Sequence, residues 1–278
     1  MTSPDDYLSS LFSLDHQVAI VTGGSGVLGR AMATALASAG AQVGVLGRRG
    51  EAAESVASEI RGAGYDAFVV TADVLDRESL IAARNQVLER CGKLNIVINA
   101  AGGNLPAATL PETGGIFDMS IAAFREVIDL NLTGTVQSSL IFGEAIVKSG
   151  GGSVINVSSM AASRALTRVG GYGAAKAGVE NLTRWLAVEL GRLYGGLIRV
   201  NAIAPGFFIG DQNRALLVDA KQHPTKRGEA ILARTPMGRF GAPADLAGAL
   251  IWLCGPGGRF VNGVVIPIDG GFSAYSGV

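Results

Sequence analysis

Tyr172 and Lys176 are four residues apart in a stretch rich in glycine and alanine, so they lie one turn apart on a helix predicted there. Two serines, Ser158 and Ser159, end an apolar segment just upstream. An unperturbed tyrosine has a pKa of about 10 and is a weak base at neutral pH, but a nearby cation favours its phenolate. Such a group suits proton transfer at an alcohol or carbonyl oxygen. A Tyr and a Lys at this spacing also occur by chance, so the pair needs support from elsewhere in the chain.

The composition limits the classes of partner. With 278 residues, 48% of them hydrophobic, the chain can bury the core of one domain, and we expect residues 1–278 to form a single unit. The 23 basic and 23 acidic residues balance, so no basic field is expected to attract nucleic acid or an anionic membrane. A small molecule is the favoured partner.

The cysteines, the histidines and the first residues argue against other classes. Cys91 and Cys254 are too few and too far apart for a disulfide framework, and His16 and His223 show no metal-ligand spacing with them. The first residues lack the basic region and long apolar run of a secretory signal, and apolar runs such as 247–254 are too short to span a bilayer. We expect a cytoplasmic protein without a metal site.

Short apolar segments alternate with helical ones along the chain. Strands are expected at 18–21, 43–46, 67–71, 96–98, 153–157, 198–203 and 264–266, and helices at 30–39, 51–61, 77–90, 121–148, 172–193 and 244–253. Strands that are apolar throughout are buried on both faces, so this alternation predicts an α/β fold with a doubly wound parallel sheet of the Rossmann type and helices on both faces. Ligands bind such sheets at the carboxyl ends of the strands, where two long segments near 103–120 and 206–236 are the expected substrate loops.

A glycine-rich turn follows the first predicted strand and opens the first predicted helix. Glycines here allow a tight bend and a close approach to a pyrophosphate, while the helix N-terminus offers N–H groups to its charge. The residues expected to contact a dinucleotide at this turn are Gly23, Ser25, Gly26, Val27 and Leu28.

The residues after the second strand bear on which dinucleotide binds. NAD enzymes have a carboxylate there for the ribose diol, whereas this chain has Gly47 followed by Arg48 and Arg49. A small residue leaves room and two arginines can pair with a 2′-phosphate, which favours NADP(H), with NAD(H) as the alternative. Both arginines can equally be solvated loop charges. The ends of the third and fourth strands add Asp73, Val74, Asn99, Ala100 and Gly102 as candidate cofactor contacts.

The order and spacing of these motifs resemble the short-chain dehydrogenase/reductases over nearly the whole chain. The matching positions are the glycine turn, Asp73, Asn99 to Gly102, Asn131, Ser159, Tyr172, Lys176, Pro205 with Gly206, and Asp269 to Gly271. The family's serine lies thirteen residues before its tyrosine, which selects Ser159 over Ser158. One departure is Val27, at the position of the middle glycine of the family's Thr-Gly-x-x-x-Gly-x-Gly turn, and it weakens inferences about cofactor preference.

The resemblance implies a catalytic set of Asn131, Ser159, Tyr172 and Lys176, with Tyr172, Lys176, Pro205 and Gly206 also contacting the cofactor. In this mechanism Tyr172 transfers the proton while a hydride passes to or from the nicotinamide. Lys176 lowers the tyrosine pKa and holds the ribose hydroxyls, Ser159 binds the substrate oxygen, and Asn131 positions a water that relays protons. A non-catalytic nucleotide-binding protein is the less favoured alternative, because it would not need this set.

Several segments resemble the branch known as D-mannonate oxidoreductases, or D-fructuronate reductases: 99–104, 204–208 with 212–214, 235–240 and 271–278. A sugar acid needs a cation for its carboxylate and polar groups for its hydroxyls. The candidates are Asn104, Arg164, Arg168, Gln212, Asn213 and Arg214. The apolar Phe207, Phe208 and Met237 instead suit a bulkier ketone or a 3-oxoacyl thioester.

Two late segments resemble the family's usual subunit interface. They are the apolar stretch 244–253 and the strand near 263–271, and they imply a homotetramer. The aromatic tail 272–278 is expected either to close a neighbour's active site or to pack on its own subunit.

Overall fold

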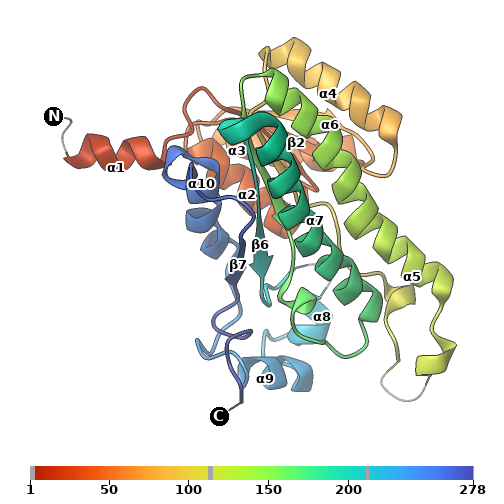
Figure 1. The fold of residues 1–278 in the computed structure, drawn as a ribbon. Helices are drawn as coiled ribbons and strands as arrows, with labels where there is room; N and C mark the ends of the chain where they lie inside the picture. Colours follow the sequence, from red (N-terminus) through yellow and green to blue (C-terminus); the bar gives the residue numbers. More distant parts are fainter. Residues whose placement is uncertain (1–3, 112–114, 211–212, 278) are drawn as a thin grey trace.

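The computed structural model describes residues 4–111, 115–210 and 213–277, and its centre is one parallel sheet (Figure 1). The strands are β1 (Val18–Thr22), β2 (Gln42–Gly47), β3 (Ala67–Thr71), β4 (Ile96–Asn99), β5 (Gly152–Val157), β6 (Ile198–Pro205) and β7 (Val265–Ile268). Their order is β3-β2-β1-β4-β5-β6-β7, and every neighbouring pair is parallel. The predicted doubly wound fold is confirmed.

The strand order reverses between β1 and β4, and this reversal sets the place of the site. Asn99 pairs with Thr22 of β1 and with Asn156 of β5, so these three strands end at one level. Strands β1 and β6 are buried along their full length, as expected for apolar runs covered on both faces. A crevice outside the carboxyl ends at such a reversal is the usual ligand site of this architecture.

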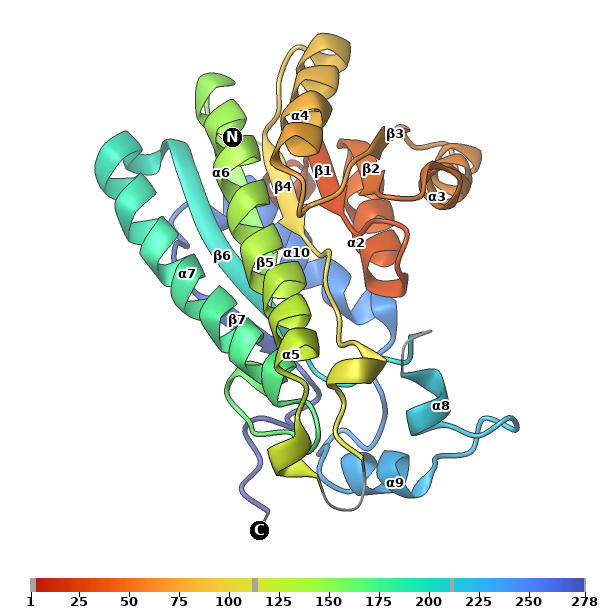
Figure 2. The ribbon, with the colours of Figure 1, turned by 90° about the vertical axis from the view of Figure 1, so that its right-hand side faces the viewer.

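Helices cover both faces of the sheet (Figure 2). The first layer is α2 (Val27–Ser38), α3 (Gly50–Gly62) and α10 (Ala247–Cys254), and the second is α4 (Arg77–Cys91), α6 (Gly134–Lys148) and α7 (Gly170–Tyr194). Each layer packs its apolar side chains into a separate core, with Leu36 in the first and Phe142 in the second fully buried. None of the helices in the described ranges is both long and apolar enough to cross a membrane.

The helix predicted over 121–148 is interrupted. α5 (Ile121–Ile128) passes into a π-helical turn, Asp129–Thr133, before α6 continues. The interruption contains Asn131, whose side chain is completely buried. Such π turns are frequent at functional positions, and hydrophobic periodicity does not reveal them.

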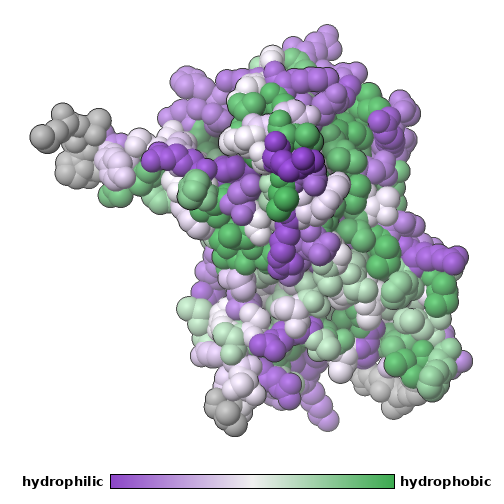
Figure 3. All heavy atoms as spheres, viewed as in Figure 1, coloured by the Kyte–Doolittle hydropathy of each residue, from purple (hydrophilic) through white to green (hydrophobic). Residues whose placement is uncertain are grey.

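Further helical segments lie outside the predicted ones. α1 (Pro4–Phe12) was not predicted and projects from the body of the molecule (Figures 1 and 3). The two long segments contain structure of their own: α8 (Arg214–Leu217) and α9 (Lys226–Leu232) in one, and the 3-10 turns Pro106–Ala108 and Ile116–Asp118 in the other. Other 3-10 turns are Met160–Ala162, Gly195–Leu197, Pro256–Gly258 and Pro243–Leu246, the last of which replaces the start of the helix predicted over 244–253.

Candidate active site

The carboxyl end of β5 meets one face of α7, and this contact brings the predicted catalytic residues together. Lys176 is buried, and its ammonium donates to the main-chain oxygen of Val157 at 2.8 Å. Ser159 follows two residues later and hydrogen-bonds the side chain of Tyr172. The phenol, the serine hydroxyl and the ammonium therefore share one small region, as the spacing in the sequence predicts.

Burial controls both titrating groups of this region. It raises the pKa of Tyr172, while the hydrogen bond with Ser159 lowers it in part. Burial also lowers the pKa of Lys176 to about 8. The expectation that Lys176 brings the tyrosine pKa down is not met in this structure, because the net shift is upward and the ammonium lies 5.6 Å from the ring centroid.

The serine pair is fixed from both sides. The Ser159 hydroxyl oxygen accepts from the Ala161 N–H at 3.2 Å, at the start of a 3-10 turn. Ser158 is buried and donates to Glu180 Oε1 at 3.0 Å. Ser158 is therefore bonded to a carboxylate on α7 that was not among the predicted residues.

Asn131 connects the π turn to the loop after β4. Its Oδ1 accepts from the Gly103 N–H at 2.9 Å, and its Nδ2 donates to the oxygens of Gly103 and Val127 at 2.8 and 2.9 Å. A Cβ on Gly102 would lie 2.6 Å from Asn131 Oδ1 and 3.4 Å from Lys176 Nζ. The side chain of Asn131 therefore holds the loop beside Lys176.

The glycine turn has the geometry expected of a phosphate-binding loop. Gly23 has a φ of 63°, and a Cβ on Gly29 would lie 2.1 Å from the Gly23 oxygen, so the helix packs directly on the turn. α2 then begins at Val27, and its N-cap residue Gly26 has no side chain to cap the helix. Ser25, Val27 and Leu28 lie at this opening. First-turn N–H groups without a side-chain cap are what a dinucleotide pyrophosphate requires, so these residues fit such a cofactor.

The end of β2 carries the residues on which the expected cofactor preference rests. Gly47 is buried, and a Cβ there would lie 3.4 Å from the Ser25 hydroxyl oxygen, so a longer side chain would face the glycine turn. Arg48 and Arg49 are exposed, and Arg48 forms an ion pair with Asp73 across 3.8 Å. Val74, beside Asp73, is buried and packs close to Gly134 of α6.

The amide of Asn99 is directed away from the position expected for it. Its Nδ2 donates to Ser139 of α6 and to Asn156 of β5, both at 2.8 Å, and Asn156 donates in turn to Thr183 of α7 at 2.9 Å. These are buried contacts between the sheet and one helical layer. Asn99 thus anchors the end of β4, while Ala100 and Gly102 continue past the strand end.

The end of β6 is held against the end of β7. The Gly206 N–H donates to the Ile268 oxygen at 2.9 Å, and a Cβ on Gly206 would lie 2.7 Å from Asp269. Asp269 accepts from the N–H groups of Gly271 and Ser273 at 2.9 and 2.8 Å. Pro205 and Gly206 therefore lie at the carboxyl end of β6, and close packing against Asp269 requires a glycine at position 206.

The predicted substrate arginines on the β5–α7 loop bond to other loops. Arg164 donates through Nε and Nη2 to the Ser273 oxygen, and Arg168 donates through Nε to the Leu110 oxygen. The tail also packs Phe272 edge-on against Phe207, with ring centroids 5.3 Å apart. The tail was expected either to close a neighbour's active site or to pack on its own subunit. These contacts are of the second kind.

The other predicted substrate residues are more dispersed. Asn104 donates to Thr109 at 2.6 Å within its own loop, and Asn213 donates to the Phe208 oxygen at 2.9 Å. Arg214 is exposed and donates to Gln222. Gln212 lies outside the described residues.

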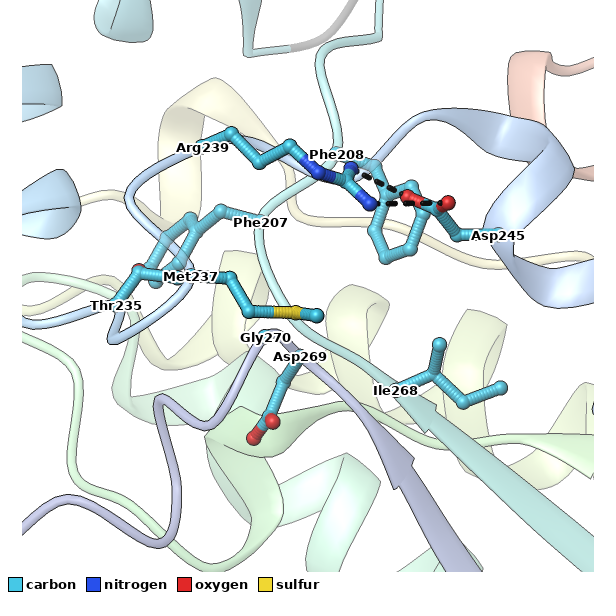
Figure 4. A pocket seen from close by; sticks show the side chains of 10 residues that line it. Phe207, Phe208, Thr235, Met237, Arg239, Asp245, Ile268, Asp269 and Gly270 are labelled. Atoms are coloured by element: carbon cyan, nitrogen blue, oxygen red, sulfur yellow. Dashed lines mark hydrogen bonds and ion pairs between the residues drawn. The ribbon is translucent and has the colours of Figure 1, made fainter.

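A pocket lies at the carboxyl ends of β6 and β7 (Figure 4). Phe207, Phe208, Met237 and Ile268 supply apolar walls, and the ion pair between Arg239 and Asp245 lies along one side. None of the predicted catalytic residues is among the residues that line this pocket. It unites the aromatic residues and the methionine that the sequence suggested for a bulkier substrate.

Besides Arg239 and Asp245, two further charged residues near the site were not predicted. Glu180 is one turn beyond Lys176, a spacing that was available in the sequence. Arg227 of α9 contacts Thr167 at 3.4 Å and so connects the long segment after β6 to the β5–α7 loop. Nothing in its local sequence distinguishes Arg227 from a solvated charge. Among the described residues, no group of three or more potential ligands could hold a metal ion.

Comparison with known proteins decides the family. A family model described as "Enoyl-(Acyl carrier protein) reductase" matches residues 24–273. The "Uncharacterized oxidoreductase UxuB" of Bacillus subtilis is 45% identical over 275 residues, covering 96% of this chain and 98% of that protein. The chain belongs to the short-chain dehydrogenase/reductase family. As a member it is an oxidoreductase that interconverts an alcohol and a ketone with a nicotinamide dinucleotide.

Two solved structures of this family are closely similar. One, from Haemophilus influenzae, is described as a candidate D-mannonate oxidoreductase with bound NAD; it is 41% identical, with a TM-score of 0.89 over 98% of this chain and 100% of that one. The other is a gluconate 5-dehydrogenase from Burkholderia cenocepacia in complex with NADP and tartrate. It is 29% identical, with a TM-score of 0.87 over 96% of this chain and 99% of that one.

Proposed function

We propose that this short-chain dehydrogenase/reductase interconverts a secondary alcohol and a ketone on a sugar acid, such as D-mannonate and D-fructuronate, with NADP(H) preferred over NAD(H). The observation that carries the catalytic part is the meeting of Ser159, Tyr172 and Lys176 at the end of β5. The substrate class is supported by the similar structures described as acting on mannonate and gluconate.

The chain's own residues provide proton transfer and positioning. A bound nicotinamide dinucleotide supplies or accepts the hydride. Tyr172 gives a proton to the carbonyl oxygen in reduction and takes it back in oxidation, while Ser159 holds that oxygen. Lys176 holds the ribose hydroxyls, and Asn131 keeps the neighbouring loop in place.

The cofactor residues follow from the glycine turn and the ends of β2, β3 and β4. The turn residues Gly23 to Leu28 hold the pyrophosphate, and Arg48 and Arg49 bind the 2′-phosphate in the space beside Gly47. The preference for NADP(H) rests on that space and on the two exposed cations.

The substrate is enclosed by the segments near 103–120 and 206–236. Asn104, Arg164, Arg168, Gln212, Asn213 and Arg214 are the proposed polar contacts, and Arg227 joins them because it links α9 to the β5–α7 loop. The bonds of Arg164 and Arg168 to carbonyl oxygens of other loops support an additional role in shaping the enclosure.

A homotetramer completes the proposal. β7 is an edge strand, and α10 is apolar along its whole length although only Leu250 and Leu253 are buried. An apolar helix face and an open strand edge are surfaces that subunit contacts usually cover. Light scattering after size exclusion tests this; a monomer at micromolar concentration would contradict it.

The decisive test of catalysis is Tyr172→Phe, assayed with both nucleotides on fructuronate, mannonate, gluconate and an acetoacetyl thioester. Loss of the general acid and base should reduce kcat by about 10²–10⁴-fold while nucleotide binding persists. Normal turnover in this variant would reject the assignment, and inactivity of the wild type on all sugar acids would reject the substrate class.

A bulkier ketone or a 3-oxoacyl thioester is the second candidate. It is favoured by one observation, the pocket in which Phe207, Phe208 and Met237 meet. Greater catalytic efficiency on the thioester than on any sugar acid, reduced by Met237→Asp, would support this candidate over the first.

A further inference from the structure

Four successive residues at the end of β5 each bond to one face of α7. Asn156 donates to Thr183 at 2.9 Å, and the Val157 oxygen accepts from Lys176 at 2.8 Å. Ser158 donates to Glu180 at 3.0 Å, and the side chain of Ser159 bonds to Tyr172. The partners on α7 are residues 172, 176, 180 and 183, which helical geometry places on one face.

Two of these bonds belong to catalytic residues and one is an interior contact of the sheet. The remaining bond, between Ser158 and Glu180, lies between the Lys176 bond and the Ser159 bond along the strand. Ser158 is 2% exposed, and the Glu180 side chain is 13% exposed. The low exposure of the Glu180 carboxylate at this junction indicates that it has a local function.

Glu180 is itself held in position. Its Oε2 lies 3.3 Å from Arg184 Nη2, an i,i+4 pair with the acid on the N-terminal side, which is the favourable orientation on a helix. Its Oε1 then accepts from Ser158, while the Ser158 N–H donates to the Ile203 oxygen of β6 at 2.8 Å. Ser158 is thus fixed on both its side chain and its backbone.

We propose that Glu180 is a positioning residue of the reaction: by holding Ser158 against α7, it directs the hydroxyl of the next residue, Ser159, toward Tyr172. Rotation of the backbone at Ser158 would turn Ser159 away, since the two are adjacent. Glu180 therefore acts through Ser158 on Ser159 and does not itself contact the substrate.

The inference rests on the proposed roles of Ser159 and Tyr172, and it is tested by Glu180→Ala, Glu180→Gln, Ser158→Ala and the double variant. The loss of a hydrogen bond to a charged group changes an equilibrium constant by about tenfold. We therefore expect Glu180→Ala and Ser158→Ala each to lower kcat about tenfold, because the productive position of Ser159 is less populated, while the nucleotide KM stays unchanged. Glu180→Gln keeps an acceptor oxygen and should recover most of the rate. The double variant should be no slower than either single one.

The pH profile separates positioning from a general structural role. Ser159 lowers the pKa of Tyr172, so a displaced Ser159 should move the pH dependence of alcohol oxidation to higher pH in Glu180→Ala. Glu189→Ala is the matched control, because Glu189 also lies on α7 and pairs with Arg192 at 3.3 Å without reaching β5. Its kcat and pH profile should match those of the wild type.

The contradicting results are specific. A folded Glu180→Ala variant with wild-type kcat and pH profile, or rate losses that multiply in the double variant, would overturn the role of Glu180. Equal losses in the alanine and glutamine variants would also overturn it. Full activity in Tyr172→Phe would instead reject the proposed catalytic function, so the two failures are distinguishable.

Discussion

The ammonium of Lys176 lies 2.8 Å from the main-chain oxygen of Val157, the last residue of β5. The strand end thereby provides a fixed acceptor for a charge that burial disfavours. One bond cannot replace full hydration, and burial lowers the pKa of Lys176 from 10.5 to about 8. Burying Lys176 in its charged form therefore lowers the free energy of unfolding.

That cost predicts how stability depends on pH. Between pH 8 and 10.5 the unfolded chain keeps a proton on Lys176 that the folded chain has released. The contribution of this group to the free energy of unfolding therefore rises with pH across that window, by about 3 kcal/mol at most. Tyr172, whose pKa burial raises above 10, acts in the opposite direction only at the alkaline end.

The measurement is denaturant unfolding of the wild type and of Lys176→Met across this window. The difference in unfolding free energy between the two should shift in favour of the wild type as the pH rises. A constant difference would show that Lys176 titrates at its ordinary pKa in the folded protein.

The sequence sufficed for the sheet and for the closeness of Tyr172 and Lys176, because both depend on local patterns. Buried strands are continuous apolar runs, and the interval between Tyr172 and Lys176 is one helical turn wherever the helix lies. The π turn at Asn131 was not predicted, since residues 121–148 were interpreted as one continuous helix. The direction of the Asn99 amide could not be predicted from the sequence either, because it depends on Ser139, forty residues away in sequence.

Glu180 and the substrate arginines show the same limit. A charged residue on a helix is usually solvated, and only the fold reveals that Ser158 faces Glu180. Arg164 and Arg168 look like free cations in the sequence, yet each donates to a carbonyl oxygen of a distant loop. The upward shift of the Tyr172 pKa had the same origin, because burial cannot be read from the spacing of Tyr172 and Lys176.

Gly102→Ala should impair the site by crowding alone. The added Cβ would lie 2.6 Å from Asn131 Oδ1 and 3.4 Å from Lys176 Nζ, so the loop or both side chains must move. Overpacking of this kind costs about 1–3 kcal/mol, and we expect a lower melting temperature together with a higher KM for the nucleotide.

Gly62→Ala is the control for that substitution. Gly62 ends α3, and a Cβ there meets nothing within 4 Å. This change should leave turnover unaltered and stability equal or slightly higher, since alanine reduces the freedom of the unfolded chain. Comparable loss of activity in both variants would attribute the effect to something other than crowding at Lys176.

Gly47→Asp should shift the nucleotide preference from NADP(H) toward NAD(H). An aspartate at the end of β2 would face the Ser25 side of the glycine turn, where it can accept from a ribose diol and repel a 2′-phosphate. We expect the ratio of kcat/KM for NADP(H) to that for NAD(H) to fall at least about tenfold, which is about 1.4 kcal/mol. Arg48→Ala should lower the same ratio without improving NAD(H). An unchanged ratio in both variants would contradict the preference.

Asn131→Ala and Asn131→Asp should destabilise the protein in a defined order. Alanine removes three hydrogen bonds and leaves the N–H of Gly103 and the oxygens of Gly103 and Val127 without this partner. Unpaired buried groups of this kind cost about 1–3 kcal/mol each unless water reaches them.

Aspartate keeps the acceptor for the Gly103 N–H, but it directs a carboxylate oxygen at two carbonyl oxygens in a fully buried position. The melting temperature should therefore fall from wild type to alanine to aspartate, whereas Asn85→Ala, at an exposed asparagine of α4, should leave it unchanged. A more stable aspartate than alanine variant would mean that the amide does not donate to these two oxygens.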